Sequence, residues 1–189
     1  MKMAKRLSAI LLAALLVAIS ISSAGGAAVA IPKFPSPILI TCTGQTPGSL
    51  TLMGFFEAVK IKATHDMMIL PSKMGGFKTL IIVMGASLKG LGAAGIDQDE
   101  EMERDTIVVK KAKDSGMKII AAHIEGTARR NAIADKFITP FVPSADFLLV
   151  LEESNQDGLF TQLSEKYKIP LYVFKDFSEL PAILEKMFK

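Results

Sequence analysis

Short, mostly apolar segments alternate with polar segments along the chain from residue 37 onward. A short continuous apolar segment is typical of a strand that is buried on both faces of a parallel sheet. The pattern predicts six strands, of which the second is expected at an edge of the sheet. The apolar segments are Pro37–Thr43, Met67–Leu70, Leu80–Met84, Lys118–Ile124, Ala145–Leu151 and Pro170–Phe174.

Helical patterns fill most of the intervals between these strands. The longest, Asp97–Ser115, has acidic residues in its first turns and lysines in its last turns, as the helix macrodipole favours. Thr46 is expected to cap a helix that extends to about Lys62, and Ser178 is expected to cap the closing helix. The two remaining helices are shorter, and they are expected to end near Phe137 and to cover Gly158–Tyr167.

This alternation predicts a single α/β domain with a doubly wound, mainly parallel sheet of five to six strands and helices on both faces. The architecture is a three-layer sandwich of the flavodoxin-like or Rossmann-like type, with the expected strand order 2-1-3-4-5 and room for a sixth strand. Right-handed crossovers bring the carboxyl ends of parallel strands to one edge of the sheet. Open α/β sheets bind their ligands at that edge, so the polar residues that follow the strands are the candidate site.

The first thirty residues have the pattern of a secretory signal peptide. Lys2, Lys5 and Arg6 precede an apolar segment at Ala9–Ile21, and Ala28-Val29-Ala30 forms an A-x-A cleavage site. The apolar segment is shorter than the ~20 residues that a membrane-spanning helix needs, which disfavours the rival interpretation of an uncleaved anchor. The predicted organisation is a signal peptide at 1–30, an extended lead-in at 31–36 and one α/β domain at 37–189.

Loss of this signal peptide would leave an electrically neutral protein. The full chain has 22 Lys and Arg against 19 Asp and Glu, and residues 1–30 contain three basic residues and no acidic one. A neutral domain lacks the basic surface of a nucleic-acid-binding protein, so no nucleic acid partner is expected. We expect a periplasmic or extracellular protein without stable membrane insertion after cleavage.

The cysteine and the two histidines limit the chemistry that the chain can support. Cys42 is the only cysteine, so no internal disulfide can form, and its apolar neighbours predict a small buried hydrophobe. His65 and His123 are too far apart in the sequence to have metal-ligand spacing. We therefore expect no metal and no cofactor. The chain also lacks the G-x-S-x-G motif of many serine hydrolases.

Five polar segments follow the predicted strands, and we expect them to meet around one hollow. Hydroxyl, amide and loop N–H groups near Gln45 suit a small anion, while Lys89 and Arg129 complement its charge. Glu125 or Asn155 would orient the ligand. The predicted ligand-binding residues are Gln45, Thr46, Ser49, Ser87, Lys89, Glu125, Arg129 and Asn155.

Two glycine-containing turns are candidates for anion binding. Gly90–Gly95 matches G-x-G-x-x-G, but the motif begins late after its strand and acidic residues follow it directly, which disfavours a dinucleotide. Gly44–Ser49 is the better candidate because no acidic residue follows until Glu57, so the helix start is not neutralised by its own sequence. An ordinary strand-to-helix turn remains the alternative for Gly44–Ser49.

Four segments that follow strands together resemble a known family: GQTPGS, GASLKGLGAAGID, HIEGTARR and LEESNQDGLF. Over about Pro37 to Phe188 the chain is similar to domain of unknown function 6305, an uncharacterised family of exported bacterial proteins. The resemblance implies an exported bacterial α/β domain and assigns no activity and no catalytic residue. The family pattern has a serine after the glutamine of the first segment, where Thr46 keeps the hydroxyl.

Three functions fit these observations. The first is an exported domain that binds a small anionic metabolite at the carboxyl edge of the sheet. The second is an enzyme that uses the same crevice, with His123 or Glu125 as its acid or base. The third is a structural or partner-binding protein in which the polar loops only contact one another. The sequence specifies neither a protein partner nor an oligomeric state.

Overall fold

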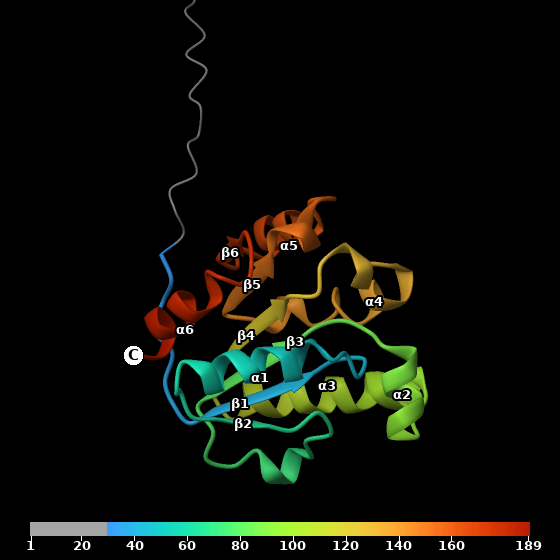
Figure 1. Ribbon diagram of the computed structural model, residues 1–189. Coiled ribbons are helices and arrows are strands. Elements are labelled where there is room, and N and C mark those ends of the chain that lie inside the picture. The colour runs from blue at the N-terminus through green and yellow to red at the C-terminus, as the bar shows by residue number, and fades with distance from the viewer. Residues whose placement is uncertain (1–29) are drawn as a thin grey trace, which may run out of the picture.

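The computed structural model describes residues 30–189, which form one sheet of six parallel strands with helices on both faces (Figure 1). The strand order β2-β1-β3-β4-β5-β6 confirms the predicted fold, including the sixth strand. The predicted signal peptide lies outside the described residues. The strands are β1 Ile38–Cys42, β2 Ala63–His65, β3 Thr79–Val83, β4 Lys118–His123, β5 Phe147–Leu151 and β6 Leu171–Phe174.

The central strands are buried on both faces, as their apolar sequences predict. Every residue of β1, β3 and β5 is buried, and alternate side chains contribute to two separate hydrophobic clusters. The prediction of a strand at Met67–Leu70 is wrong, because β2 lies earlier, at Ala63–His65. Only three residues of β2 pair with β1, so the edge strand is too short to leave an apolar pattern in the sequence.

The helices form two layers that cover the sheet. Helices α1 and α6 pack with the lead-in residue Phe34 on one face, whereas α3, α4 and α5 cover the other. Figure 1 shows α2 and α4 at the end toward which the strands point. The helices are α1 Gly48–Ala58, α2 Leu88–Ala94, α3 Gln98–Asp114, α4 Ala132–Lys136, α5 Leu159–Tyr167 and α6 Leu180–Phe188. No helix within residues 30–189 is long and apolar enough to span a bilayer.

Two of the predicted helix caps are wrong. Helix α1 starts at Gly48 after Pro47, and α6 starts after Glu179, and neither has a side-chain cap. Thr46 does not cap α1 because its hydroxyl donates to the carboxylate of Glu125 instead. Helix α3, in contrast, begins with a complete capping box formed by Asp97 and Glu100.

The glycine-rich segment after β3 is mostly helical. Ser87 caps α2 by accepting a hydrogen bond from the Gly90 backbone N–H at 3.0 Å, and Gly95 ends the helix with φ of 71°. The first two glycines of the G-x-G-x-x-G match therefore lie inside α2 rather than in a turn between strand and helix. A dinucleotide-binding turn needs these glycines at the strand-to-helix junction, so this segment does not form one.

Candidate functional site

The loops after β1 and β3 lie against each other at the carboxyl edge of the sheet. The Ser87 backbone N–H donates to the Gly44 carbonyl at 2.8 Å. A Cβ atom at Gly90 would come within 2.3 Å of the Gln45 carbonyl oxygen, so this approach requires glycine. The predicted convergence of these two loops is therefore a direct backbone contact, with little space left between them.

Glu125 joins this arrangement from the end of β4 and reaches the start of α1. Its carboxylate accepts a hydrogen bond from Thr46 Oγ1, and a Cβ atom at Gly48 would lie 3.0 Å from that carboxylate. Gly85 gives similar room, because a Cβ there would lie 3.3 Å from Glu125 Oε2. The start of α1 is thus neutralised by a carboxylate from β4, which corrects the expectation of a helix start open to an anion.

Burial raises the pKa of Glu125, although the Thr46 hydrogen bond, the Arg129 charge and the Gly48 backbone N–H oppose this shift. A carboxyl group with a raised pKa can take up and release a proton closer to neutral pH than an exposed glutamate can. Glu125 therefore remains a candidate acid or base as well as a candidate ligand contact.

A buried charge cluster on α3 holds the other part of the β1–α1 loop. The Gly44 backbone N–H donates to Asp105 Oδ2 at 3.2 Å, and the Gln45 backbone N–H donates to Glu101 Oε1 at 3.1 Å. Arg104 lies between these carboxylates, 2.8 Å from Glu101 and 2.5 Å from Asp105. Arg104 also donates to the Cys42 carbonyl at 2.9 Å. The loop N–H groups that an anion would need are occupied by the chain's own carboxylates.

The cluster contains two carboxylates and one cation in a nearly dry site. Burial raises the pKa of Asp105 to about 8, with the Arg104 charge opposing and the Glu101 charge adding to the shift. Burial also raises the pKa of the nearby Cys42 thiol to about 12, so it is neutral at physiological pH. This agrees with the interpretation of Cys42 as a buried hydrophobe.

Several of the predicted site residues have internal hydrogen-bond partners. The Gln45 side chain donates to Glu101 and to the Met67 carbonyl. Asn155 Oδ1 accepts from the Phe160 backbone N–H at 2.9 Å. Ser87 caps α2, as described above, whereas Lys89 is exposed. The site roles proposed for these four residues remain predictions.

Ser49 and His65 form a pair that the sequence did not suggest. Ser49 Oγ lies 3.1 Å from His65 Nε2, and burial lowers the pKa of His65 although Asp66 opposes the change. A neutral histidine beside a serine hydroxyl is one element of nucleophilic catalysis. Ser49 is completely buried at the start of α1, however, so its hydroxyl is not accessible to a substrate in this conformation.

A crevice of about 320 Å³ lies at the carboxyl ends of β4 and β5. Two of the predicted ligand-binding residues, Glu125 and Arg129, line it. Apolar side chains from the loops after β4 and β6 and from the end of β5, together with Thr51 of α1, complete the crevice. The other lining residues are Thr51, Ile124, Ala128, Leu151, Glu153 and Phe177.

The two consecutive arginines of this loop have different environments. The Arg130 side chain is 8% exposed and is bound by Asp135 at 3.0 Å, by Asp157 at 2.8 Å and by the Ser154 carbonyl. Arg129 is 39% exposed, and its one ion pair with a described residue is the 3.6 Å contact to Glu125. Arg129 therefore has donors available for a ligand, while Arg130 connects the loops.

His123 lies in the interior and does not line this crevice. Its side chain is completely buried, stacks on Phe160 and contacts the Met84 carbonyl through Nδ1 at 2.7 Å. Nε2 has no hydrogen-bond partner of normal geometry among the described residues, although the Gly126 backbone is close enough to oppose the lowered pKa. Burial is the main cause of that lowered pKa, so His123 is a neutral core residue.

The charge cluster of Glu101, Arg104 and Asp105 was not predicted from the sequence. Glu101 and Asp105 have the same spacing as Val108 and Ala112, which places all four on the buried face of α3. That periodicity was the signal that could have identified them. Phe177 was also not predicted, because only the folded chain brings its loop beside Arg129. Within residues 30–189, no group of His, Cys, Asp and Glu side chains is arranged to hold a metal ion.

Comparison with known proteins gives a family and a distant structural likeness. The crystal structure of the psychrotrophic esterase EstA from Pseudoalteromonas sp., inhibited by monoethylphosphonate, aligns with 79% of this chain and 92% of the esterase chain. The identity is 12% and the TM-score is 0.31, so this likeness carries no argument about function. No curated protein matches the sequence. The family model described as Domain of unknown function (DUF6305) matches residues 35–188, and the chain belongs to that family.

Proposed function

We propose that this domain binds a small anionic molecule in the crevice at the carboxyl ends of β4 and β5. The observation that supports the proposal most is the half-exposed Arg129 guanidinium, whose nearest carboxylate is 3.6 Å away and is itself hydrogen-bonded to Thr46. A guanidinium binds carboxylates and phosphates through two parallel hydrogen bonds. Arg129 is the proposed anchor for the anionic group.

The other charges of the crevice restrict the ligand further. Glu125 and Glu153 also line it, so a ligand with only negative groups would meet repulsion from both. A ligand with a carboxylate for Arg129 and a hydroxyl or amino donor for one of the glutamates has no such conflict. The apolar walls formed by Ile124, Leu151 and Phe177 would accept an aliphatic part. Small hydroxy acids and amino acids are the proposed ligand class.

The raised pKa of Glu125 makes the binding dependent on pH. Protonation of Glu125 removes a negative charge beside Arg129, so a bound carboxylate is less repelled at acidic pH. We expect the affinity for a plain carboxylate to increase as the pH falls. In Glu125→Gln, whose side chain is neutral at every pH, this increase is expected to be lost.

The test is thermal unfolding of the protein with a panel of amino acids, hydroxy acids, plain carboxylates and phosphate. At least one organic acid is expected to raise the Tm of the wild type and to have no effect on Arg129→Gln. Lys111→Gln is the matched control, because it removes one exposed positive charge outside the crevice. Equal Tm shifts in the wild type and in Arg129→Gln would exclude Arg129 as the anchor.

An enzyme that uses the same crevice is the second candidate, because Glu125 lines the crevice and has a raised pKa. His123 is no longer a candidate for the acid or base, since it is buried away from the crevice. Turnover of a bound acid that is lost in Glu125→Gln and retained in Arg130→Lys would favour the enzyme. Binding without turnover would favour the binding domain. A panel without any hit would favour a structural or partner-binding role, which the internal hydrogen bonds of Gln45 and Asn155 also support.

We also propose that the protein is exported. The proposal depends on the basic, apolar and small residues of the first thirty positions. Expression of the full chain in a bacterium, followed by N-terminal sequencing of the recovered protein, tests it. A mature protein that begins at Ile31 is expected, and a cytoplasmic protein that keeps Met1 would contradict the proposal.

A further inference from the structure

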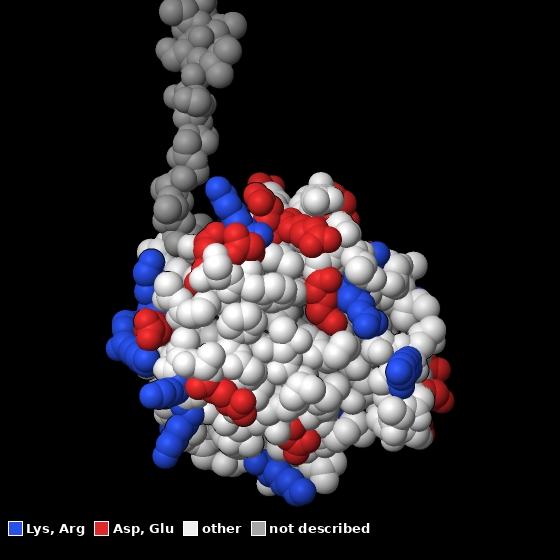
Figure 2. Space-filling model, viewed as in Figure 1, with Lys and Arg blue, Asp and Glu red and all other residues white. Residues whose placement is uncertain are grey.

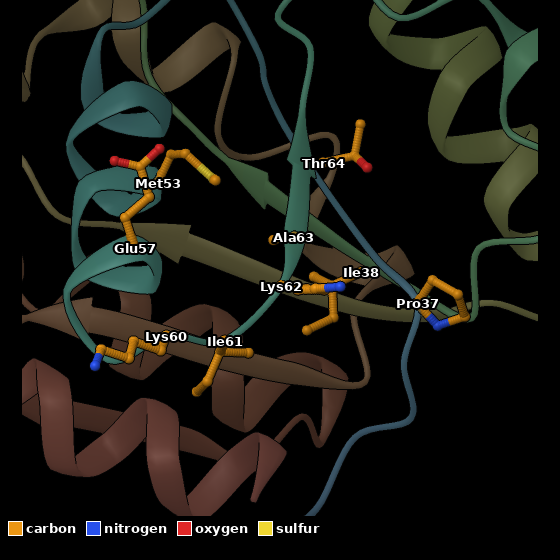
Figure 3. A pocket seen from close by; sticks show the side chains of 9 residues that line it. All are labelled: Pro37, Ile38, Met53, Glu57, Lys60, Ile61, Lys62, Ala63 and Thr64. Atoms are coloured by element: carbon orange, nitrogen blue, oxygen red, sulfur yellow. The ribbon is translucent and has the colours of Figure 1, made fainter.

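A second hollow lies at the opposite edge of the sheet from the proposed site. It consists of a cavity of about 600 Å³ and a neighbouring cavity of about 400 Å³, which share Pro37, Lys60, Ile61 and Lys62. Figure 3 shows that the larger cavity lies between the last turns of α1, the amino end of β2 and the chain that enters β1. This hollow is larger than the crevice beside Arg129, and the proposed function does not use it.

The lining of this hollow is mainly apolar. Ile38 and Ile61 form its buried part, and Met53 extends from α1 toward β2 (Figure 3). Phe188, near the end of α6, lines the adjoining cavity. A methionine wall adapts its shape to different aliphatic groups, and the volume lies in the range of sites for small organic molecules. The hollow therefore suits an aliphatic chain.

Lysines surround the opening of the apolar hollow. Lys60 and Lys62 flank the buried Ile61 in the turn between α1 and β2, and Lys189 lines the adjoining cavity. Figure 2 shows basic side chains along the side of the molecule where Figure 1 places the C-terminus. Lys189 pairs with Glu185 at 2.8 Å, and Glu57 also lines the larger cavity, so Lys60 and Lys62 supply most of the available positive charge. The charge is complementary to an anionic head group.

Lys60 has a backbone conformation that usually belongs to glycine. Its φ is 57°, and it occupies the turn after α1 in which Lys60 N–H donates to the Glu57 carbonyl and Ile61 N–H to the Phe56 carbonyl. This is a Schellman motif, where glycine is the common residue because a side chain is disfavoured at positive φ. The conformation costs stability, yet it places a lysine in the lining of the apolar hollow.

We propose that this hollow binds an anionic amphiphile, a free monocarboxylic acid with an aliphatic chain. The chain would lie against Ile38, Met53 and Ile61, and the carboxylate would lie at Lys60 and Lys62. This ligand differs from that of the Arg129 crevice, because most of its surface is apolar and its single charge remains near solvent.

The test compares the Tm of the full chain with decanoate, with uncharged decanol and with cationic decyltrimethylammonium, all below their micelle concentrations. Decanoate is expected to raise the Tm of the wild type by several degrees, and the other two compounds are expected to have little effect. Lys60→Gly together with Lys62→Gln is expected to abolish the shift. Glycine suits the backbone at position 60, so this variant is expected to fold with an unchanged or higher Tm without ligand.

Lys168→Gly is the matched control for the glycine substitution. Lys168 has φ of 56° after α5, so the change has the same backbone effect and removes the same charge at a distant place. The decanoate shift is expected to persist in Lys168→Gly and in Arg129→Gln, which separates this site from the proposed function. An equal shift with decanol, or a shift that persists in the Lys60 and Lys62 variant, would overturn the proposal.

Discussion

The two halves of the sheet's carboxyl edge use their charged residues in opposite ways. At the end of β1, Arg104 is 11% exposed and lies within 2.8 Å of both Glu101 and Asp105, so this part of the edge is bound internally. At the end of β4, Arg129 is 39% exposed and its contact to Glu125 measures 3.6 Å. The difference teaches that convergence of polar loops does not by itself make a site. A ligand needs a charge that the fold has not already bound.

The largest effect on stability is expected from disrupting the buried charge cluster at the end of β1. Arg104→Ala leaves the completely buried Glu101 and Asp105 without their cation, which is expected to lower the free energy of unfolding by about 3–5 kcal/mol. Lys110→Ala is the control, because it breaks an exposed ion pair with Asp114 and is expected to cost less than about 1 kcal/mol. Urea unfolding measures both. Equal effects would show that burial of the cluster does not contribute to its stability.

The next effect is a pH dependence that comes from Asp105. Its pKa is about 8 in the folded chain against 3.8 ordinarily, so the folded state holds a proton that the unfolded state releases. This contribution is complete below pH 4 and is lost as the pH rises to about 8. Asp105→Asn is expected to remove this decrease from urea unfolding curves between pH 5 and pH 9.

The two histidines affect the same measurement with the opposite sign. Burial lowers the pKa of His65 and His123, so stability is lost as the pH falls through their ordinary value of 6.5. The informative quantity is therefore the difference in the free energy of unfolding between the wild type and Asp105→Asn at each pH. A difference that does not change with pH would mean that Asp105 is already ionised in the folded protein.

A smaller effect on stability is expected at Thr46, which contacts Glu125 from the loop after β4. Thr46→Val removes the hydrogen bond to Glu125 and is expected to lower the free energy of unfolding by about 1–3 kcal/mol. The same bond opposes the raised pKa of Glu125, so that pKa is expected to rise further. Carboxyl NMR titration detects the change. Thr46→Ser keeps the hydroxyl and is expected to behave like the wild type. If Thr46→Ser were as unstable as Thr46→Val, the hydrogen bond to Glu125 would not be the cause of the effect.

The smallest effect concerns Asn155, a predicted site residue with structural partners. Its Oδ1 accepts backbone hydrogen bonds from Phe160 at 2.9 Å and from Thr161 at 3.3 Å at the start of α5. Asn155→Ala is expected to cost about 1 kcal/mol, as loss of a helix cap does, without changing ligand affinity. Gln156→Ala alters an exposed neighbour and is the control. If Asn155→Ala bound a ligand more weakly than the wild type, Asn155 would have a role in ligand binding.

The sheet could be predicted from the sequence because its long strands are mostly apolar. Burial on both faces leaves no polar position in Leu80–Val83 or Phe147–Leu151, and the helices between the strands require parallel pairing. The edge strand β2 could not be placed by the same rule. Its three residues have one neighbouring strand and only partial burial, so its sequence was not constrained to be apolar.

The site could be predicted only in part, because the sequence shows which residues follow strands and not what they contact. Glu125 and Arg129 were identified and do line a crevice. The start of α1 was expected to be open because no acidic residue is near in the sequence, yet Glu125 neutralises it from β4. Long-range contacts of this kind decide which polar groups remain available to a ligand, and local sequence patterns do not indicate these contacts.

The carboxylate at the start of α1 belongs to a residue 79 positions after Thr46. A nascent chain that stops before β4 therefore contains the whole helix sequence but lacks the acidic group that meets the helix in the finished protein. Contacts across so long a loop are slow to form, because closing the loop costs entropy. An amino-terminal fragment of this chain that ends before β4 is therefore expected to be a poor folding unit.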